Sequence, residues 1–250
     1  MIRQLAVAIA FLTRLPVPSR RAFEAADVGR SSRWFPLIGL IIGGIFVAAL
    51  HLLTPIFPPL VTAFLIAAID ALLTGALHLD GLADSADGLG GGRTREDVLR
   101  IMRDHAIGSY GALALVLVIA IKAAALAALI DRHRAAAYLA LMPMLGRWSV
   151  VLPSATQPYA RRLEQEGAAR GGAVSDFVGR AELLIASATA LPIVFALASW
   201  RGLAAALLVF AATGIWSWYC CRRIGGITGD TLGAGVEISE TLVLLFGLIQ

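Results

Sequence analysis

Seven long apolar segments divide this chain of 250 residues, and their lengths constrain the fold more than any other feature. A helix needs about 20 mostly apolar residues to cross about 30 Å of hydrocarbon. With 58% hydrophobic and 15% charged residues, the composition is that of a membrane protein. The sequence therefore predicts an all-α, polytopic helical bundle with six or seven spans, built as a single integral membrane domain over residues 1–250. The expected spans are 37–57, 60–77, 110–130, 135–152, 181–199, 202–221 and a last segment that ends at residue 250.

The first apolar segment, residues 2–15, is different because it is too short to cross the hydrocarbon. Its pattern is helical, and Pro16 follows it. Arg3 and Arg14 lie near its two ends, where they can reach water. We expect an N-terminal helix that lies in the membrane interface.

Arginine is distributed unevenly over the expected loops. The loops 1–36, 78–108, 153–180 and 222–231 would share one side of the membrane, and they hold sixteen arginines. The opposite loops hold only Arg132, Arg134 and Arg201. Short loops rich in Lys and Arg face the cytoplasm, so the sequence places all four arginine-rich loops there. Basic residues exceed acidic ones by only 21 to 17, a surplus too small to indicate nucleic-acid binding.

The densest group of carboxylates lies in residues 78–111, directly after an expected span. If residues 79–89 are helical, Asp80, Asp84 and Asp87 are spaced i, i+4 and i+7 and share one face. Carboxylate oxygens suit Mg²⁺, which is usually held by one or two carboxylates and substrate phosphates. The alternative is a solvated acidic face. The position at a span end favours a metal site at Asp80, Asp84 and Asp87.

Two glycine-rich stretches are expected on the same side as the carboxylates. Glycine lets backbone N–H groups approach phosphate oxygens closely, and arginine binds phosphate with two parallel hydrogen bonds. A turn at a helix end is the alternative for the glycines, and a topology signal for the arginine. Together with the carboxylates, these residues predict a site for a magnesium-bound diphosphate. The phosphate-binding candidates are Gly90, Gly91, Gly92, Arg93, Gly226 and Gly229.

Four blocks of the sequence carry a resemblance to a known family. They read FLTRLPVP near the N-terminus, then HLDGLADSADGLGGG, IMRDHAIGSYGALAL and GGITGDTLGAGVEISE. In this order they resemble the cobalamin synthase family, also called adenosylcobinamide-GDP ribazoletransferase or cobalamin 5′-phosphate synthase. His105 departs from the family's usual pattern, whereas Arg103 keeps a cation at its position.

The resemblance implies an integral membrane transferase in the last steps of vitamin B12 assembly. It would join adenosylcobinamide-GDP to α-ribazole or α-ribazole 5′-phosphate and release GMP, with Mg²⁺ as cofactor. It would lie in the bacterial inner membrane, in contact with lipid and with its site facing the cytoplasm. No nucleic-acid partner is expected, and a homo-oligomer is left open.

The resemblance also suggests roles for further residues. Asp104 or Asp230 would complete the metal shell or accept the proton of the attacking hydroxyl. Arg93, Arg103 or Arg161 would neutralise the charge that develops on the departing GMP.

Two other classes of function are compatible with parts of the sequence. Asp84-Ser-Ala-Asp87-Gly88 matches the start of the CDP-alcohol phosphotransferase motif, although the continuation of that motif is missing. A transporter could line its path with the intramembrane charges of Asp70, Lys122 and Arg147. Transporters often show internal repeats, and none is recognisable here. A purely structural scaffold is least compatible, because it needs no carboxylates and glycines gathered on one face.

Overall fold

The computed structural model describes residues 2–18, 22–161 and 173–249 of the chain. Apart from an isolated bridge between Tyr159 and Ile227, the regular structure of these residues is helical, which confirms the predicted all-α class. In chain order, the helices are α1 (Ile2–Leu12), α2 (Ala25–Ser31), the 3₁₀ turn η1 (Ser32–Trp34), α3 (Phe35–Leu53), α4 (Pro59–Thr74), α5 (Leu77–Gly91), α6 (Arg95–Ile101), α7 (Ser109–Asp131), α8 (Ala135–Thr156), α9 (Ala173–Asp176), α10 (Arg180–Ile224) and α11 (Gly229–Leu248).

Five helical stretches in the described part of the chain are long and apolar enough to cross a membrane, which confirms a polytopic membrane protein. They are α2 to α3 taken together, α7, α8, α10 and α11. The bent pair of α4 and α5 gives a sixth if it is counted as one span. The fifth and sixth predicted spans both lie in the 45 residues of α10, which is kinked at Ala198 and Ser199.

The second predicted span, residues 60–77, ends earlier than expected. Gly75 and Ala76 both have positive φ, at 66° and 57°, and the axes of α4 and α5 meet there at 93°. Glycine adopts this left-handed conformation without steric strain and commonly ends helices. The bend separates the apolar α4 from α5, which carries three aspartates. With 15 residues and three aspartates, α5 is by itself too short and too polar to be a membrane-spanning segment.

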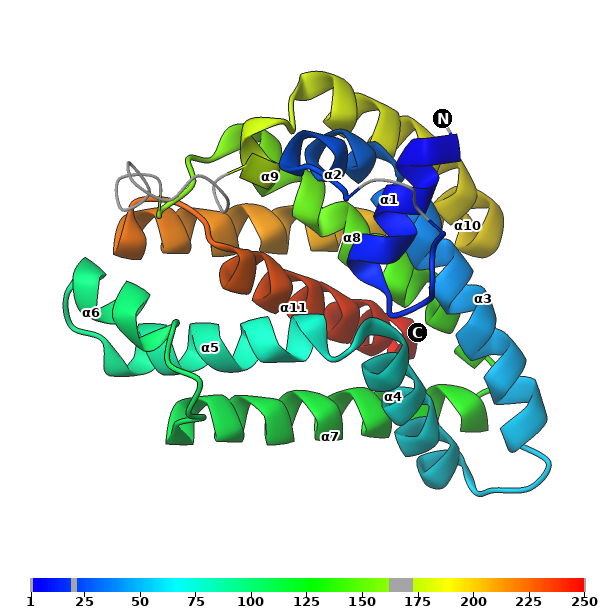
Figure 1. Ribbon diagram of the computed structural model, residues 1–250. Coiled ribbons are helices and arrows are strands. Elements are labelled where there is room, and N and C mark those ends of the chain that lie inside the picture. Colours follow the sequence, from blue (N-terminus) through cyan, green and yellow to red (C-terminus); the bar gives the residue numbers. More distant parts are fainter. Residues whose placement is uncertain (1, 19–21, 162–172, 250) are drawn as a thin grey trace.

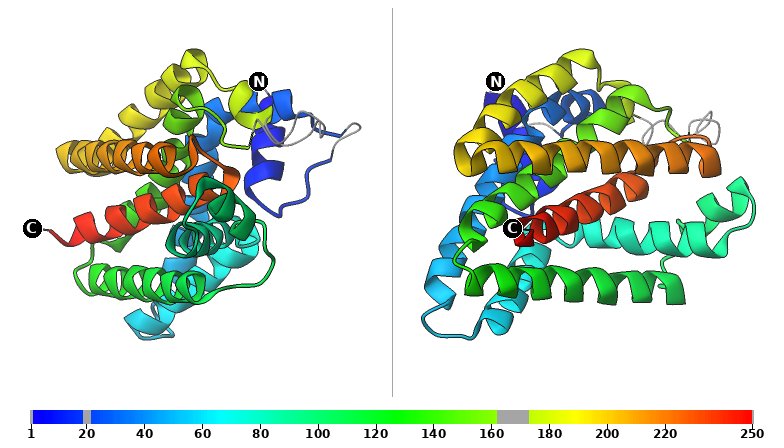
Figure 2. Two further views of the ribbon diagram at one scale, coloured as in Figure 1. Left: turned by 90° about the vertical axis from the view of Figure 1, so that its left-hand side faces the viewer. Right: turned by 180° about the vertical axis from the view of Figure 1, so that it is seen from behind.

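Beyond the bend, α5 joins a set of helices that run side by side. Figures 1 and 2 show α5, α7, α11 and the second half of α10 extending in a common direction. Helix α11 packs against α5, α7, α8 and α10, whereas α3 packs mainly against α8. The core includes Phe35, Phe46, Leu139 and Met144, each less than 2% exposed. This arrangement gives α11 contacts with most of the bundle.

Helices α5 and α11 approach closely because glycines occupy their crossing. A Cβ atom on Gly81 would lie 2.8 Å from the backbone oxygen of Asp230, and one on Gly233 would lie 3.4 Å from the Cα of His78. Small residues at a helix crossing allow the backbones to come together. The aspartates of α5 are thereby brought beside the N-terminus of α11.

The N-terminal helix α1 is eleven residues long, shorter than a span, as the sequence predicts. Its buried residues Val7, Ala8 and Leu12 face the bundle, where α1 contacts α2 and α3. The backbone N–H of Arg14 donates to the carbonyl of Leu73, 2.7 Å away. The segment after α1 is therefore tied to the end of α4. An interfacial position of α1 stays a prediction.

Candidate functional site

Three aspartates from two helices meet where α5 crosses α11. Asp80 is exposed and Asp84 half-buried on α5, and Asp230 is the second residue of α11. Partial burial, and then the nearby negative charges of Asp80 and Asp230, raise the pKa of Asp84 to about 6. Repulsion of this kind is relieved when a cation binds between the carboxylates. The cluster Asp80–Asp84–Asp230 therefore gathers negative charge that a bound cation would neutralise.

Asp230 has a basic partner in Arg161, whose Nη2 lies 2.8 Å from its carboxylate. A short pairing of two backbone segments positions this arginine. The N–H of Ala160 donates to the carbonyl of Ile227 (2.8 Å), and the N–H of Ile227 donates to the carbonyl of Pro158 (2.9 Å). Arg161 is thus held beside Asp230 although 69 residues separate them in the chain.

A cavity of about 220 Å³ opens beside the cluster. Asp80, Asp230 and Gly229 lie on its wall, together with His78. A side chain at Gly229 would meet no atom within 4 Å, so the first turn of α11 is open to a ligand. The N-terminus of a helix attracts anions, since its first N–H groups have no partner within the helix. The cavity thus combines an acidic edge with a potential phosphate position.

Asp87, the third aspartate of α5, has a different environment. Its carboxylate accepts hydrogen bonds from the backbone N–H groups of Gly108 (2.7 Å) and Gly111 (2.8 Å) at the start of α7. A side chain at Gly108 or Gly111 would collide with this carboxylate. Asp87 therefore caps α7 from the neighbouring helix and joins α5 to α7.

We expect the substitution Asp87→Ala to lower the free energy of unfolding by about 1–2 kcal/mol, because two helix N–H groups lose their acceptor. Asp87→Asn keeps one acceptor oxygen, so its loss should be smaller. Thermal unfolding of both variants in the same detergent, monitored by circular dichroism, measures the difference. Equal melting temperatures for Asp87→Ala and the unchanged protein would contradict the capping role.

The predicted phosphate-binding glycines at the end of α5 have different surroundings. Gly90 and Gly91 end α5, and Gly92 follows it. A side chain at Gly90 would meet the ring of Tyr110, and one at Gly92 would meet Val98, so helix packing accounts for both glycines. Gly91 is exposed.

Four more predicted site residues have distinct surroundings. Arg93 and Arg103 are exposed. Asp104 is also exposed, in the loop between α6 and α7, where its carboxylate accepts the N–H of Ala106 at 3.1 Å. Gly226 is buried against the carbonyl of Pro158, in the backbone pairing that holds Arg161. Of the predicted candidates, the wall of the cavity brings together Asp80, Asp230 and Gly229.

No three His, Cys, Asp or Glu side chains within the described ranges are arranged as a complete metal site. Magnesium is usually held by only one or two carboxylates and completes its shell with water and substrate phosphates. The donor set at Asp80 and Asp84 fits such a partial site, since both are carboxylates and Asp84 is half-buried among like charges.

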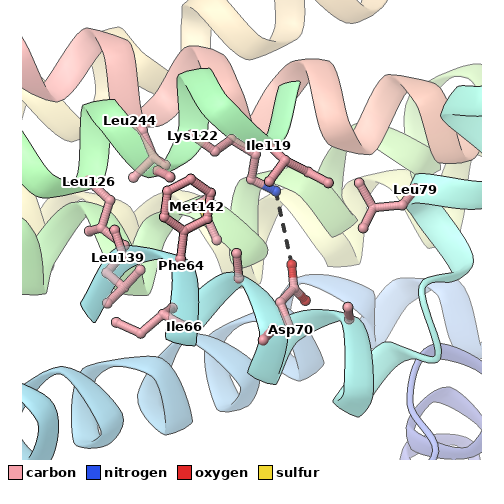
Figure 3. A pocket seen from close by; sticks show the side chains of 15 residues that line it. Phe64, Ile66, Asp70, Leu79, Ile119, Lys122, Leu126, Leu139, Met142 and Leu244 are labelled. Carbon is pink, nitrogen blue, oxygen red and sulfur yellow. Dashed lines mark ion pairs between the residues drawn. The ribbon is translucent and has the colours of Figure 1, made fainter. Parts of the chain in front are cut away.

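The intramembrane charges singled out from the sequence form a buried network with two glutamates of α11. Figure 3 shows one contact of this network, between Lys122 and Asp70, at a cavity lined by α4 and α7. Nζ of Lys122 lies 3.0 Å from Glu237, 2.6 Å from Glu240 and 4.0 Å from Asp70. The fully buried Arg147 pairs with Glu240 and lies 3.8 Å from Asp70. The charges of Lys122 and Arg147, proposed above as possible lining of a transport path, thus pair with acidic side chains inside the bundle. The ion pairs join α4, α7, α8 and α11.

Part of the cavity wall was not predicted from the sequence. Phe11 of α1, Ser32 of η1 and Phe35 of α3 line it. They precede the acidic stretch by more than 40 residues. Phe11 belongs to the segment expected to lie in the membrane interface, and Ser32 and Phe35 belong to the arginine-rich loop 1–36. Only the packing of α1 and α3 against the bundle reveals their position.

Comparison with known proteins assigns a family to the chain. The family model described as cobalamin-5-phosphate synthase matches residues 4–248. A protein of Desulfitobacterium hafniense named adenosylcobinamide-GDP ribazoletransferase is 38% identical over 98% of this chain and 96% of its own length. Proteins of the same name from Klebsiella pneumoniae (40%; 98% and 99%) and Rhizobium etli (43%; 95% and 93%) are also similar. No solved structure matches the chain. With its fold, its acidic cluster and these relatives, the chain belongs to the cobalamin-5-phosphate synthase family.

Proposed function

We propose that this protein joins adenosylcobinamide-GDP to α-ribazole or its 5′-phosphate and releases GMP. The family supports this reaction, since its members carry the name of the ribazole transferase. The observation that carries the proposal for the site is the convergence of Asp80 and Asp230 on one cavity, with Asp84 beside them. Neither rival explains this cavity: the CDP-alcohol motif lacks its continuation, and the intramembrane charges pair with one another.

Asp80 and Asp84 would hold Mg²⁺, with Asp87 acting on the site only by fixing α5 against α7. Bound magnesium would neutralise negative charge on the diphosphate. The two carboxylates come from adjacent turns of one helix, so their spacing is fixed by α5. The exposed Asp80 stands nearer to an arriving diphosphate than the half-buried Asp84.

Asp230 is the proposed acceptor of the proton from the attacking ribazole hydroxyl. The hydroxyl oxygen forms a bond to the phosphorus nearer the corrinoid, and the bond from that phosphorus to the bridging oxygen breaks. GMP leaves with the bridging oxygen. Arg161, paired with Asp230 before substrate binds, would stabilise the charge on the departing phosphate. Asp104 and Arg103 lie in the loop between α6 and α7, and we assign them no step.

The site would face the cytoplasm of the bacterial inner membrane. The loop that contains α6, the start of α11 and the end of α8 lie toward one end of the bundle in Figure 1. These are the arginine-rich segments that the distribution of charge assigns to the cytoplasm. The assignment is also consistent with substrates that carry a nucleotide.

The experiment that tests the proposal is release of GMP by the purified protein in lipid nanodiscs. Adenosylcobinamide-GDP is supplied with α-ribazole or α-ribazole 5′-phosphate, with Mg²⁺ or with EDTA. We expect release that depends on both the acceptor and the metal. Release without an acceptor would indicate a hydrolase, and equal release in EDTA would contradict the magnesium site.

The raised pKa of Asp84 predicts how this reaction depends on pH. A raised pKa means that the protonated carboxyl persists up to about pH 6, and only the ionised form binds the metal. The magnesium concentration for half-maximal rate should therefore be nearly constant above about pH 7. It should rise as the pH falls through 6, by up to about tenfold per unit at lower pH. Titrations of Mg²⁺ at several pH values measure this, and a constant half-maximal concentration between pH 5 and 7 would contradict it.

A further inference from the structure

The cavity beside the acidic cluster has a wall whose chemistry the proposed reaction does not yet use. Phe11 and Phe35 lie on it with their rings nearly parallel, 5.8 Å apart between centroids and tilted by 13°. Leu12, Val150 and Val178 extend this apolar surface. Phe11 is 41% exposed, whereas Phe35 is buried. The ring of Phe11 is therefore the accessible aromatic surface of the cavity that Asp80 and Asp230 also line.

Two polar side chains that line the cavity have atoms without hydrogen-bond partners. The hydroxyl of Ser32 and Nε2 of His78 are buried and unpaired, and the two residues are 1% and 6% exposed. A buried polar atom without a partner is unfavourable by about 1–3 kcal/mol, so such groups commonly await a ligand. Ser32 can donate one hydrogen bond.

The volume limits the occupant. At about 220 Å³ the cavity is smaller than the ~300–1,000 Å³ typical of sites for drug-sized ligands. A corrinoid ring cannot enter it, but one bicyclic base can. The proposed reaction involves two such bases, guanine and the base of ribazole.

The polarity of the wall distinguishes these two bases. Ser154, Tyr159 and Ser175 also border the cavity, but most of its surface is apolar. Guanine carries several donors and acceptors around its edge, and a mostly apolar wall would leave many of them without partners. The benzimidazole base of ribazole has an apolar edge with methyl groups and one ring nitrogen free to accept a hydrogen bond. One aromatic surface and one hydroxyl donor match that base.

We infer that this cavity, bounded by α1, η1, α5 and α11, binds the base of ribazole, with Phe11 stacking on the ring and Ser32 donating to its free nitrogen. The inference rests on the proposed function. It assigns the specificity for the acceptor to the N-terminal helix and to η1, which lie outside the motif-bearing stretches. The sugar of the acceptor would then point toward Asp80 and Asp230, at the acidic edge of the cavity.

The test measures KM for each substrate in nanodiscs. We expect Phe11→Ala to raise KM for α-ribazole about tenfold, a loss typical of one stacking partner, and to change KM for adenosylcobinamide-GDP less than twofold. Phe64→Ala is the matched control, because Phe64 is similarly exposed (45%) but lies on α4, where it lines a separate cavity together with Asp70 and Lys122 (Figure 3). An unchanged KM for α-ribazole would overturn the inference. A rise confined to adenosylcobinamide-GDP would assign the cavity to guanosine instead.

Ser32→Ala gives a second test, in which a loss of binding can be distinguished from a loss of folding. The hydroxyl has no partner in the protein, so its removal should not lower the melting temperature. KM for α-ribazole should rise about tenfold. An analogue with CH in place of the free ring nitrogen should have the same KM with Ser32→Ala as with the unchanged protein. Thr213→Val is the control, since Thr213 also has an unpaired buried hydroxyl but does not line this cavity. Equal sensitivity of both ligands to Ser32→Ala would overturn the hydrogen bond.

A binding measurement separates this inference from the proposed reaction. Calorimetry with α-ribazole alone, without the GDP-activated substrate, should show binding that Phe11→Ala weakens about tenfold. If the protein binds α-ribazole in this way but releases no GMP, the reaction is wrong and the site stands. If GMP is released and both variants bind α-ribazole normally, the reaction stands and the site is wrong.

Discussion

Asp84→Asn should abolish magnesium-dependent release of GMP, lowering the rate at least about a thousandfold, and should leave the protein folded. The substitution keeps the shape of the side chain but removes the charge that holds the cation. Losing a group that stabilises charge in a transition state typically lowers kcat by about 10²–10³, and loss of the metal adds to this. Initial rates at saturating substrate, with the metal varied from micromolar to millimolar, measure the effect.

The same variant should be at least as stable as the unchanged protein in the absence of magnesium. The pKa of Asp84 is raised, so its charged form destabilises the folded state at neutral pH, and this penalty is lost as the pH falls toward 4. Because the side chain is only half-buried, solvent screening limits the gain from Asn to about 1 kcal/mol or less. Added magnesium should raise the melting temperature of the unchanged protein but not of Asp84→Asn. A variant that unfolds, or one that keeps its metal response, would contradict the metal role.

Arg147→Met should have the largest effect on stability. Arg147 is fully buried and pairs with Glu240, with Asp70 at 3.8 Å. Breaking a buried ion pair from one side leaves an uncompensated charge and is unfavourable by about 3–5 kcal/mol. We expect a strong fall in melting temperature or in the yield of folded protein. Size-exclusion chromatography in detergent, followed by thermal unfolding, measures both.

The balance of charge within the network provides the controls. Three carboxylates face two cations, Lys122 and Arg147. Glu237→Gln removes one carboxylate and leaves two of each sign, so we expect little loss or a gain in stability. The double variant Arg147→Met/Glu240→Gln should recover more than half of the loss caused by Arg147→Met. Equal losses for Arg147→Met and Glu237→Gln would mean that packing, and not charge, explains the effect.

Much of this fold follows from local patterns in the sequence. The apolar lengths predicted a membrane bundle, and the spacing of the aspartates predicted the helix that is observed as Leu77–Gly91. The bend at Gly75 shortened the second predicted span, because a glycine in the left-handed conformation ended α4 inside an apolar run. The predicted spans 181–199 and 202–221 correspond to the two halves of α10, which are separated by a kink at the non-helical residues Ala198 and Ser199.

The contacts of the site residues were harder to predict, because residues on one face of a helix contact different neighbouring helices. Asp84 and Asp87 share a helical pattern, yet only the packing of α7 reveals that Asp87 meets the N–H groups of Gly108 and Gly111. Arg161 and Asp230 were both candidates, but their pairing depends on a backbone contact between distant segments. Phe11 and Ser32 carry no motif at all. Local periodicity defines a helix face, whereas only tertiary contacts decide what that face touches.

The buried ion pairs are incomplete until α11 has been synthesised. Asp70, Lys122 and Arg147 are synthesised before Glu237 and Glu240, which belong to α11. Until α11 is in place, Lys122 and Arg147 have only Asp70 as a possible acidic partner in this network. A ribosome that stops before α11 thus leaves unbalanced positive charge inside the bilayer, a costly state. Helix α11, which also carries Asp230, therefore has two roles. It completes the proposed site, and its glutamates neutralise the buried cations that would otherwise destabilise the bundle.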